Sequence, residues 1–307
     1  MTEVRNLIAI IGPTASGKTS LAARLASRIN GEVISADSRQ VYRHMNLGTG
    51  KDYEDYIVDG VRVPWHLLDI AEPGYKYSVF EYQRDFFHAF TDIHSRGKMP
   101  VLCGGSGMYI DAAVKGYKLI DVPYNEKLRK ELQSKSPEEL NRMLVSLKEL
   151  HNTTDTDSAE RAIRAIEIAA FRQLHPEITS KLPPVNPVFI GVLYERNTER
   201  ARITDRLRTR LKQGMVEEVQ QLLASGIPME TLVYYGLEYK FITLYLSGAL
   251  TYEDMFTLLN TAIHQFAKRQ RTWFRKMEKE GAEIHWLDGE LSPDEKVEKA
   301  IRLVNAG

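Results

Sequence analysis

The chain has one cysteine, no long apolar run and no excess of charge of either sign. Its single cysteine, Cys103, excludes an internal disulfide and a cysteine-based metal site, and its apolar neighbours predict a buried strand position. No stretch approaches the roughly 18 apolar residues of a membrane span, and the N-terminus lacks a secretory pattern, so we expect a soluble cytoplasmic protein. The 41 basic residues equal the 41 acidic ones, so any nucleic-acid partner must meet a local basic surface.

What is present is a phosphate-binding loop close to the start of the chain. Residues 12–19 fit the pattern G-x-x-x-x-G-K-[ST] at every specified position and follow the apolar run Leu7–Ile11. In such a loop backbone N–H groups point at an anion, the next helix adds its positive end, and the Lys and Thr side chains supply a cation and a magnesium ligand. The pattern predicts a polyphosphate site, with ATP as the default ligand, formed by Gly12, Pro13, Thr14, Ala15, Ser16, Gly17, Lys18 and Thr19.

Strand and helix patterns alternate through the first third of the chain. Apolar residues recur every four positions after the loop, which predicts a helix from Gly17 to about Ile29. Alternation of this kind indicates an α/β protein with a P-loop-containing, doubly wound parallel sheet. Asp37 follows one predicted strand directly, at the end of the sheet where such folds place their chemistry. The other elements expected here are strands at Glu32–Ser35, Leu67–Ile70 and Met99–Cys103, and a helix that Ser78 caps and that ends near His94.

The middle of the chain loses the β pattern. Charged helical stretches fill residues 115–187, which end in a Pro-rich segment before a new apolar strand at Val188–Leu193. We interpret residues 115–187 as a helical insertion domain and residues 1–114 with 188–307 as a P-loop core domain with C-terminal helices. The remaining elements expected are helices at Arg200–Gln213, Val216–Ala224, Leu237–Leu246 and Tyr252–Met277, and a strand at Glu283–Leu287.

Two signals of an ordinary phosphate-loop NTPase are missing. The strand that ends at Cys103 runs into Gly104 and Gly105, not into the Asp that would position magnesium and its water, and only Asp69 after Leu67 and Leu68 resembles such an ending. The guanine-reading motif N-K-x-D is absent. The chain is therefore better suited to moving a group carried on a diphosphate than to acting as an NTPase motor or switch.

Six motifs, taken together and in order, resemble the tRNA dimethylallyltransferase (isopentenyltransferase) family over nearly the whole chain. The phosphate loop alone is shared with many unrelated proteins, whereas D-S-x-Q-V-Y and K-R-Q-x-T-W together are specific. The six segments are Gly12–Thr19, Ile34–Tyr42, Gly48–Lys51, His66–Asp69, Gly104–Tyr109 and Lys268–Arg275.

The resemblance implies transfer of a five-carbon allylic group from dimethylallyl diphosphate to the exocyclic N6 of the adenosine just 3′ of the anticodon, with release of diphosphate. An aromatic amine is a weak nucleophile, so a carboxylate must accept its proton as the new bond forms. Asp37 is the candidate for this base, and an Asp at such a position can alternatively cap a helix or a turn.

The leaving diphosphate gathers negative charge, which fixed cations and N–H groups can stabilise. We expect Lys18, the loop amides and a Mg²⁺ ion on Thr19 to do so, and the histidines show no metal-ligand spacing. By the family pattern Thr14 bonds near the breaking C–O bond, and the motif R-I-x-x-R points to Arg206. The same arginine also fits the solvated side of a helix.

The target base stacks within the anticodon loop, so the enzyme must draw it into a pocket, and basic surface must hold the RNA. Basic residues dominate between Arg196 and Lys212 and again between Lys268 and Lys279. Each arginine has the alternative role of an ordinary surface charge, and Trp273 that of a core residue. The resemblance implies that Ser38, Arg39, Gln40, Arg161 and Arg164 are among the residues that contact tRNA. The full set expected is Asp37, Ser38, Arg39, Gln40, Ser106, Arg129, Arg161, Arg164, Lys268, Arg269, Trp273 and Arg275.

Four positions depart from the family pattern, and none removes a catalytic group. Asp52 stands where Pro is usual, Ser106 where Thr is typical, and Arg210 replaces a common Met. Residues 235–240 replace the usual G-Y-K-E and are expected to reshape contacts with tRNA.

Two other functions fit parts of the sequence. A small-molecule or nucleotide kinase could use the loop for ATP and Asp37 as a base, but it leaves the K-R-Q-x-T-W segment unexplained. A non-catalytic RNA-binding protein could keep the fold as a scaffold, but Thr14, Lys18, Thr19 and Asp37 are intact. We expect a transferase that acts as a monomer with tRNA and dimethylallyl diphosphate as its partners, without a membrane.

Overall fold

The computed structural model describes residues 5–117, 119–147, 158–178 and 181–306. Its centre is a six-stranded sheet in the order β5-β2-β6-β1-β7-β8, and every neighbouring pair is parallel. The α/β fold class is thereby confirmed. The strands are β1 (Leu7–Ile11), β2 (Gly31–Ala36), β5 (Trp65–His66), β6 (Met99–Gly104), β7 (Pro187–Leu193) and β8 (Ile284–Asp288).

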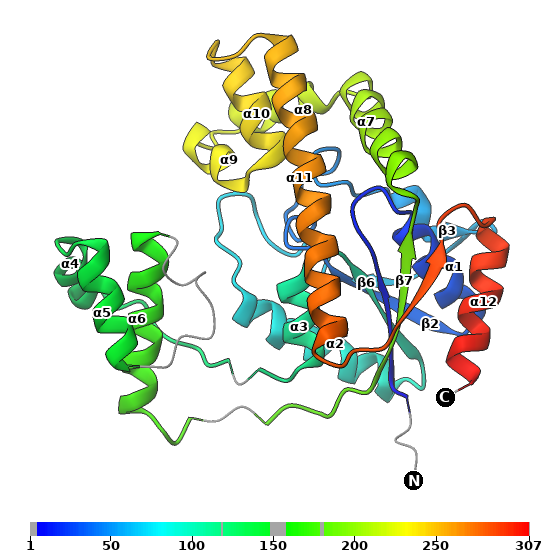
Figure 1. Cartoon of the computed structure of the whole chain (residues 1–307), viewed down its shortest axis with the longest axis horizontal. Helices are drawn as coiled ribbons and strands as arrows, with labels where there is room; N and C mark the ends of the chain where they lie inside the picture. The colour runs from blue at the N-terminus through cyan, green and yellow to red at the C-terminus, as the bar shows by residue number, and fades with distance from the viewer. Residues whose placement is uncertain (1–4, 118, 148–157, 179–180, 307) are drawn as a thin grey trace. The chain divides into compact units, whose positions relative to one another are not determined.

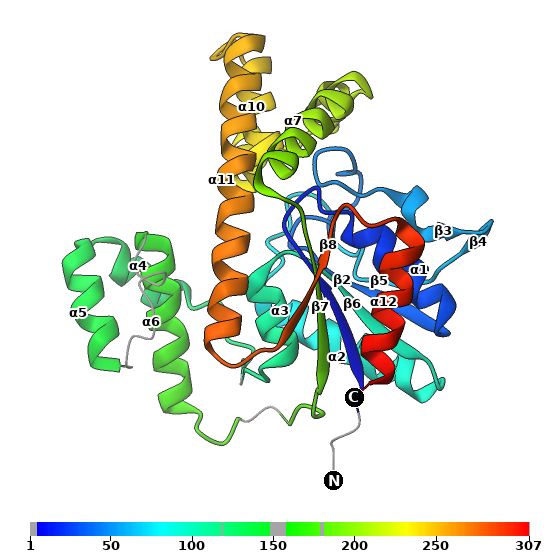
Figure 2. The ribbon, with the colours of Figure 1, turned by 45° about the vertical axis from the view of Figure 1, so that its right-hand side comes forward.

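Helices cover both faces of the sheet (Figures 1 and 2). On one face α1 (Lys18–Arg28) and α12 (Pro293–Asn305) pack with the apolar side chains of β1, β2, β6 and β7. On the other lie α2 (Val79–Ser95) and α3 (Gly107–Val114). Ser78 caps α2 with a full capping box, as expected from the sequence. A parallel sheet buried on both faces explains why its strands are continuous apolar runs, in which Cys103 is 5% exposed.

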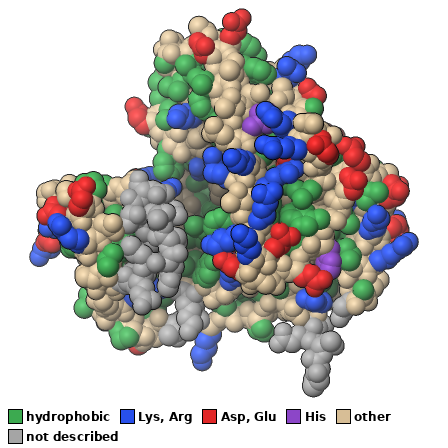
Figure 3. Space-filling view, viewed as in Figure 1, with side chains coloured by type: hydrophobic (Ala, Val, Ile, Leu, Met, Phe, Trp, Pro, Cys, Tyr) green, Lys and Arg blue, Asp and Glu red, His purple; other side chains and the backbone are tan. Residues whose placement is uncertain are grey.

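A second apolar core lies beyond the carboxyl ends of the strands, among five helices. Buried side chains such as Leu207, Tyr239 and Leu259 pack there with Tyr42 and Met45 from the loop after β2. Figure 3 shows Lys and Arg side chains gathered over the surface where Figure 1 draws α7 and α11. The helices are α7 (Arg196–Lys212), α8 (Met215–Ala224), α9 (Met229–Tyr235), α10 (Leu237–Leu246) and α11 (Tyr252–Lys279).

Residues 117–182 form a separate compact unit, and the rest of the chain forms the other. The predicted insertion 115–187 contains this unit. Its described elements are helical, and they enclose a small core that includes Leu140, Leu144 and Ile166. The helices are α4 (Glu126–Gln133), α5 (Pro137–Leu147) and α6 (Ala159–Leu174).

One predicted strand is wrong. The edge strand β5 is Trp65–His66, not Leu67–Ile70, because Leu67 and Asp69 adopt left-handed backbone angles (φ 62° and 54°) that end the extended chain. The sequence also gave no sign of three short elements: a 3₁₀ turn at Tyr53–Tyr56, the hairpin of β3 (Ile57–Val58) and β4 (Val61–Arg62), and α9. Among the described helices none is both long enough and apolar enough to cross a bilayer.

Candidate active site

The phosphate loop joins β1 to α1. Ala15 and Gly17 take positive φ angles (61° and 77°), which turn the chain so that Lys18 and Thr19 begin the helix. The Lys18 ammonium lies 3.3 Å from the Pro13 carbonyl oxygen, folded back over the loop. Burial lowers the pKa of Lys18, and the carboxylates of Asp37 and Asp52 partly oppose this shift. The loop therefore presents a sheltered cation beside the first amides of α1.

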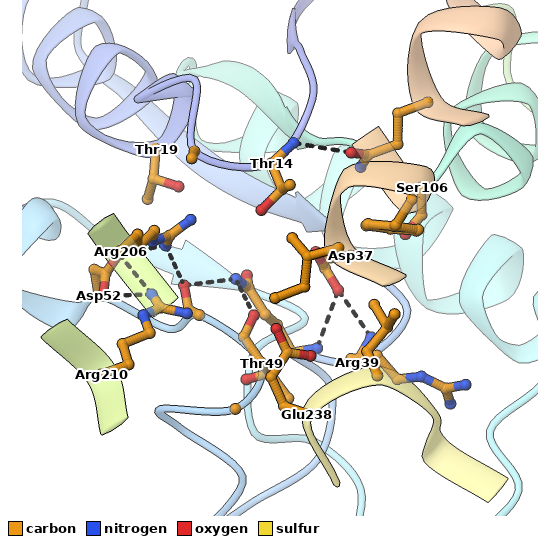
Figure 4. Close-up of a pocket in the computed structure, with 18 of the residues that line it drawn as sticks. Thr14, Thr19, Asp37, Arg39, Thr49, Asp52, Ser106, Arg206, Arg210 and Glu238 are labelled. Atoms are coloured by element: carbon orange, nitrogen blue, oxygen red, sulfur yellow. Dashed lines mark hydrogen bonds and ion pairs between the residues drawn. The ribbon is translucent and has the colours of Figure 1, made fainter. Parts of the chain in front are cut away.

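Asp37 follows β2 directly and is held by a turn. Its Oδ1 accepts hydrogen bonds from the backbone N–H groups of Arg39 (2.9 Å) and Gln40 (3.4 Å). The neighbouring Ser38 amide donates to Ser106 Oγ at 3.1 Å, so the ends of β2 and β6 are linked. Figure 4 shows Asp37 across the cavity from Thr14 and Thr19. One oxygen of the carboxylate is thus fixed by the backbone, and the other has no such bond among the described residues.

The glycines after β6 allow three segments to meet at this point. A side chain at Gly104 would begin 2.2 Å from the Ala36 carbonyl oxygen, just before Asp37. One at Gly107 would begin 2.2 Å from the indole of Trp273 on α11. Larger residues would push β2 and α11 away from the loop, so the spacing of the site depends on these close approaches.

A buried amide connects α11 to the phosphate loop. Gln270 Oε1 accepts the Thr14 backbone N–H at 2.8 Å, while its Nε2 donates to the Gly105 carbonyl at 3.0 Å. Sequence reasoning missed this residue. A signal existed, because Gln270 is a polar residue on an otherwise apolar stripe of α11 that includes Ile263, Ala267 and Phe274.

The opposite wall of the cavity comes from α7. Arg206 and Arg210 both bind the carboxylate of Asp52, at 2.7 Å from Oδ2 and 2.9 Å from Oδ1 (Figure 4). Arg210 is 8% exposed and also donates to the Leu47 carbonyl at 3.0 Å. The structure therefore brings two departures from the family pattern, Asp52 and Arg210, into one ion pair. Asp52 fixes one edge of the Arg206 guanidinium.

A further carboxyl group, that of Glu238, lines the same cavity from the first turn of α10. Burial raises its pKa to about 7, although its own backbone N–H, Arg210 and Arg206 favour the charged form and Asp37 opposes it. Glu238 therefore titrates near neutral pH in the cavity that holds Asp37. Sequence analysis did not single out this residue.

These side chains enclose a cavity of about 990 Å³. Thr14, Lys18, Thr19, Asp37 and Arg206 all line it, so the predicted catalytic set is brought together. No cluster of three or more His, Cys, Asp or Glu suited to a metal occurs within the described residues. Mg²⁺ beside phosphates keeps several waters and takes few protein ligands. The Thr19 hydroxyl at the loop, with the carboxylate of Asp55 lining the same space, suits such an ion.

A second, shallower groove of about 420 Å³ runs between α7 and α11. Arg271 crosses it to pair with Glu199 at 2.6 Å. The side chains of the other cations in this groove form no ion pair within the described residues; they are Arg196, Arg200, Lys268 and Arg275.

The remaining predicted RNA contacts lie in varied settings. Arg269 and Ser106 line the large cavity, together with Ser38, Arg39 and Gln40. The side-chain amide of Gln40 donates to the carbonyls of Gly50 (3.0 Å) and Thr49 (3.3 Å), so it supports the chain rather than facing a ligand freely. Trp273 packs its indole against Gly107, and its Nε1 is buried.

Two arginines of the separate helical unit form ion pairs with a buried carboxylate of the same unit. Arg129 and Arg164 both bind Glu167, which is 2% exposed, and Arg129 lies 2.8 Å from it. Burial opposes ionisation of Glu167, but hydrogen bonds from Arg129, the Asn125 amide and Arg164 outweigh it and lower the pKa to about 2. Arg161 is exposed on α6. The sequence showed the charges of Arg129 and Arg164 but not the buried carboxylate between them.

The fold and the site define an α/β protein of the P-loop type whose loop faces a carboxylate across a cavity. The model of the IPP transferase family matches residues 40–277, and that of the isopentenyl transferase family matches residues 5–69. The chain belongs to the IPP transferase family.

Named relatives agree over almost the full length. The chain is 56% identical over 299 residues to tRNA dimethylallyltransferase 1 of Parabacteroides distasonis, covering 97% of each chain. It is 58% identical over 292 residues to tRNA dimethylallyltransferase 2 of Bacteroides fragilis, covering 95% of each. Among solved structures it is similar to the full-length tRNA isopentenylpyrophosphate transferase of Bacillus halodurans, with 33% identity, a TM-score of 0.72, and coverage of 98% of this chain and 96% of that one.

Proposed function

We propose that this chain transfers the dimethylallyl group of dimethylallyl diphosphate to N6 of the adenosine 3′-adjacent to the anticodon in tRNA, and releases diphosphate. The observation that carries this proposal is the shared cavity, in which the phosphate loop and the Asp37 carboxylate face one another. Family membership and the names of the relatives support the same reaction.

The reaction divides between the two sides of the cavity. The adenine N6 attacks the allylic carbon, the carbon–oxygen bond to the diphosphate breaks, and the N6 proton passes to the carboxylate of Asp37. The turn that holds Asp37 Oδ1 leaves Oδ2 to receive that proton. The tRNA base would enter beside Ser38 and Arg39, next to this carboxylate.

The diphosphate would lie on residues 12–19. Lys18, the loop amides and Arg206 would offset the charge that builds on its oxygens as the bond breaks, and Thr14 would bond near the leaving oxygen. Thr19 would hold a Mg²⁺ ion, which would supply a further positive charge there. Lys268, Arg269 and Arg275 would meet RNA phosphates, with Arg161 of the helical unit as a further contact.

We propose that the protein acts as a monomer in the cytoplasm. The test is direct. Incubation of the protein with undermodified tRNA and dimethylallyl diphosphate should yield, after digestion, an adenosine heavier by one five-carbon unit. A kinase would instead be stabilised thermally by ATP far more than by dimethylallyl diphosphate. Failure to modify any tRNA would contradict the proposal.

A further inference from the structure

An exposed tyrosine, Tyr234, lies beside Arg39, which follows the candidate base Asp37 by two residues in the chain. The backbone N–H of Arg39 binds Asp37, while Figure 4 shows its side chain directed away from Asp37. Its guanidinium carbon lies 5.5 Å from the ring centroid of Tyr235 and 5.9 Å from that of Tyr234. From the loop before α2, the Lys76 ammonium lies 5.3 Å from the Tyr234 ring. Arg39 thus spans from the carboxylate to a tyrosine flanked by two cations.

The two tyrosines differ in what holds them. Tyr235 is 3% exposed, packs on Tyr42 at 4.7 Å between ring centroids and accepts the Gly74 amide with its hydroxyl. Tyr234 is 55% exposed, and its hydroxyl forms no hydrogen bond within the described residues. Tyr235 therefore anchors the end of α9, and this anchor fixes the backbone from which Tyr234 projects into solvent.

A single exposed tyrosine is ordinary on a protein surface. The combination here is more specific, because an exposed ring with two cations close to it offers stacking for a base and positive charge for the phosphates beside that base. Single-stranded RNA is recognised in this way whatever the base. Arg39 links this surface to the turn that holds Asp37, so the occupant should be a nucleotide close to the one that reacts.

We propose that Tyr234, with Arg39 and Lys76, forms a stacking platform for an unpaired nucleotide adjacent to the target adenosine in the RNA substrate. This inference rests on the proposed function, since it assigns a place to a neighbour of the reacting base. The platform holds the flanking base outside the cavity while the adenosine enters it, and so contributes to the energy of extracting that adenosine from the loop stack.

The test uses a fluorescent anticodon stem-loop RNA and three variants: Tyr234→Ala, Tyr234→Phe and, as a matched control, Tyr252→Ala at the start of α11, where the tyrosine is 47% exposed. Loss of stacking on one base should weaken RNA binding about tenfold in Tyr234→Ala. Tyr234→Phe and Tyr252→Ala should bind within about twofold of wild type. The KM for dimethylallyl diphosphate should not change in any of them.

An abasic substitution identifies the occupant. Placed on the correct side of the target adenosine, it should weaken binding to wild type about tenfold but add nothing to the loss in Tyr234→Ala, because both remove the same stack. Lys76→Gln should lower the slope of log affinity against log salt by about one. The platform would be overturned if Tyr234→Ala bound RNA as tightly as wild type. It would also be overturned if an abasic site on either side of the target adenosine weakened binding to Tyr234→Ala as much as it weakens binding to wild type. Absence of prenyl transfer by the wild-type preparation would instead contradict the proposed function.

Discussion

Helices α7 and α11 present cations to two places, the reaction cavity and the groove, and the two sets of cations are held differently. In the cavity, Arg206 and Arg210 share the carboxylate of Asp52. In the groove, four cations have no such partner within the described residues: Arg196, Arg200, Lys268 and Arg275. A guanidinium fixed by a carboxylate keeps one position, which suits stabilisation of charge that develops at one point. Unpaired surface cations attract a polyanion over a range of positions and are screened by salt. Under the proposed function, we therefore expect the cavity to serve the chemistry and the groove to capture RNA.

The largest effect should come from replacing Asp37, the proposed general base. Asp37→Asn keeps an oxygen for the turn amides of Arg39 and Gln40 but cannot accept the proton. We expect prenyl transfer to fall at least ~100-fold with tRNA affinity nearly unchanged. Single-turnover rates with saturating tRNA measure this, and filter binding provides the control. A variant that turns over like wild type would remove Asp37 from the role of base.

The next largest effect should come from releasing Arg206 from the carboxylate that fixes it. Asp52→Asn leaves Arg206 in place but removes the charge that orients it, and a hydrogen bond to a charged group contributes about 1.5–3 kcal/mol. We expect kcat/KM for dimethylallyl diphosphate to fall roughly tenfold. The KM for tRNA should stay constant. If Asp52 merely balanced charge, both substrates would respond equally and the distinction between cavity and groove would weaken.

The groove should respond differently. The double variant Arg200→Gln with Arg275→Gln should weaken tRNA binding at low salt and lower the slope of log affinity against log salt by about two. The rate at saturating tRNA should be unaffected. Lys299→Gln, an exposed lysine of α12, is the matched control and should leave the slope unchanged. A fall in the saturated rate would show that the groove participates in the chemistry.

The smallest effect concerns pH. Glu238 is neutral below its pKa of about 7 and charged above it, and the added negative charge faces Arg206 and Arg210. Affinity for dimethylallyl diphosphate should therefore fall about threefold as pH rises from 6 to 8, by the partial weakening of one charge interaction. In Glu238→Gln this dependence should flatten. Because the folded state raises this pKa above its usual 4.5, wild type should also lose stability as pH rises from about 4.5 to about 7, and the variant should lose less in thermal melts. A pH dependence that persists in the variant would assign the titration to another group.

Periodic and motif signals predicted most of the fold. The apolar runs of β1, β6 and β7 and the amphipathic helices were readable because burial on one or both faces dictates those patterns. The edge strand was predicted a few residues too late along the chain. An apolar Leu67 followed by a polar Asp69 resembles the end of a strand, and the sequence does not reveal that both residues adopt left-handed backbone angles. Short elements such as α9 carry too few turns to show a period.

The motifs predicted which residues meet in the cavity, but not the residues that hold them in position. Thr14, Lys18, Asp37 and Arg206 meet in one cavity because each stands at a strand end or on a helix that the sheet order brings together. Long-range pairs such as Gln270 with Thr14 depend on packing, which no local pattern reveals. Arg129 and Arg164 illustrate the converse, since a charge suited to RNA is used to bury Glu167.

Because of the Gln270 amide, α11 both lines the groove and positions the phosphate loop, which limits how this helix can be engineered. The same helix that lines the groove with Lys268 and Arg275 also determines where the backbone of Thr14 sits. Repacking or rotating α11 to change RNA preference would therefore disturb the donor site. RNA affinity is better adjusted at Tyr234, whose side chain is exposed and has no bond to the phosphate loop among the described residues.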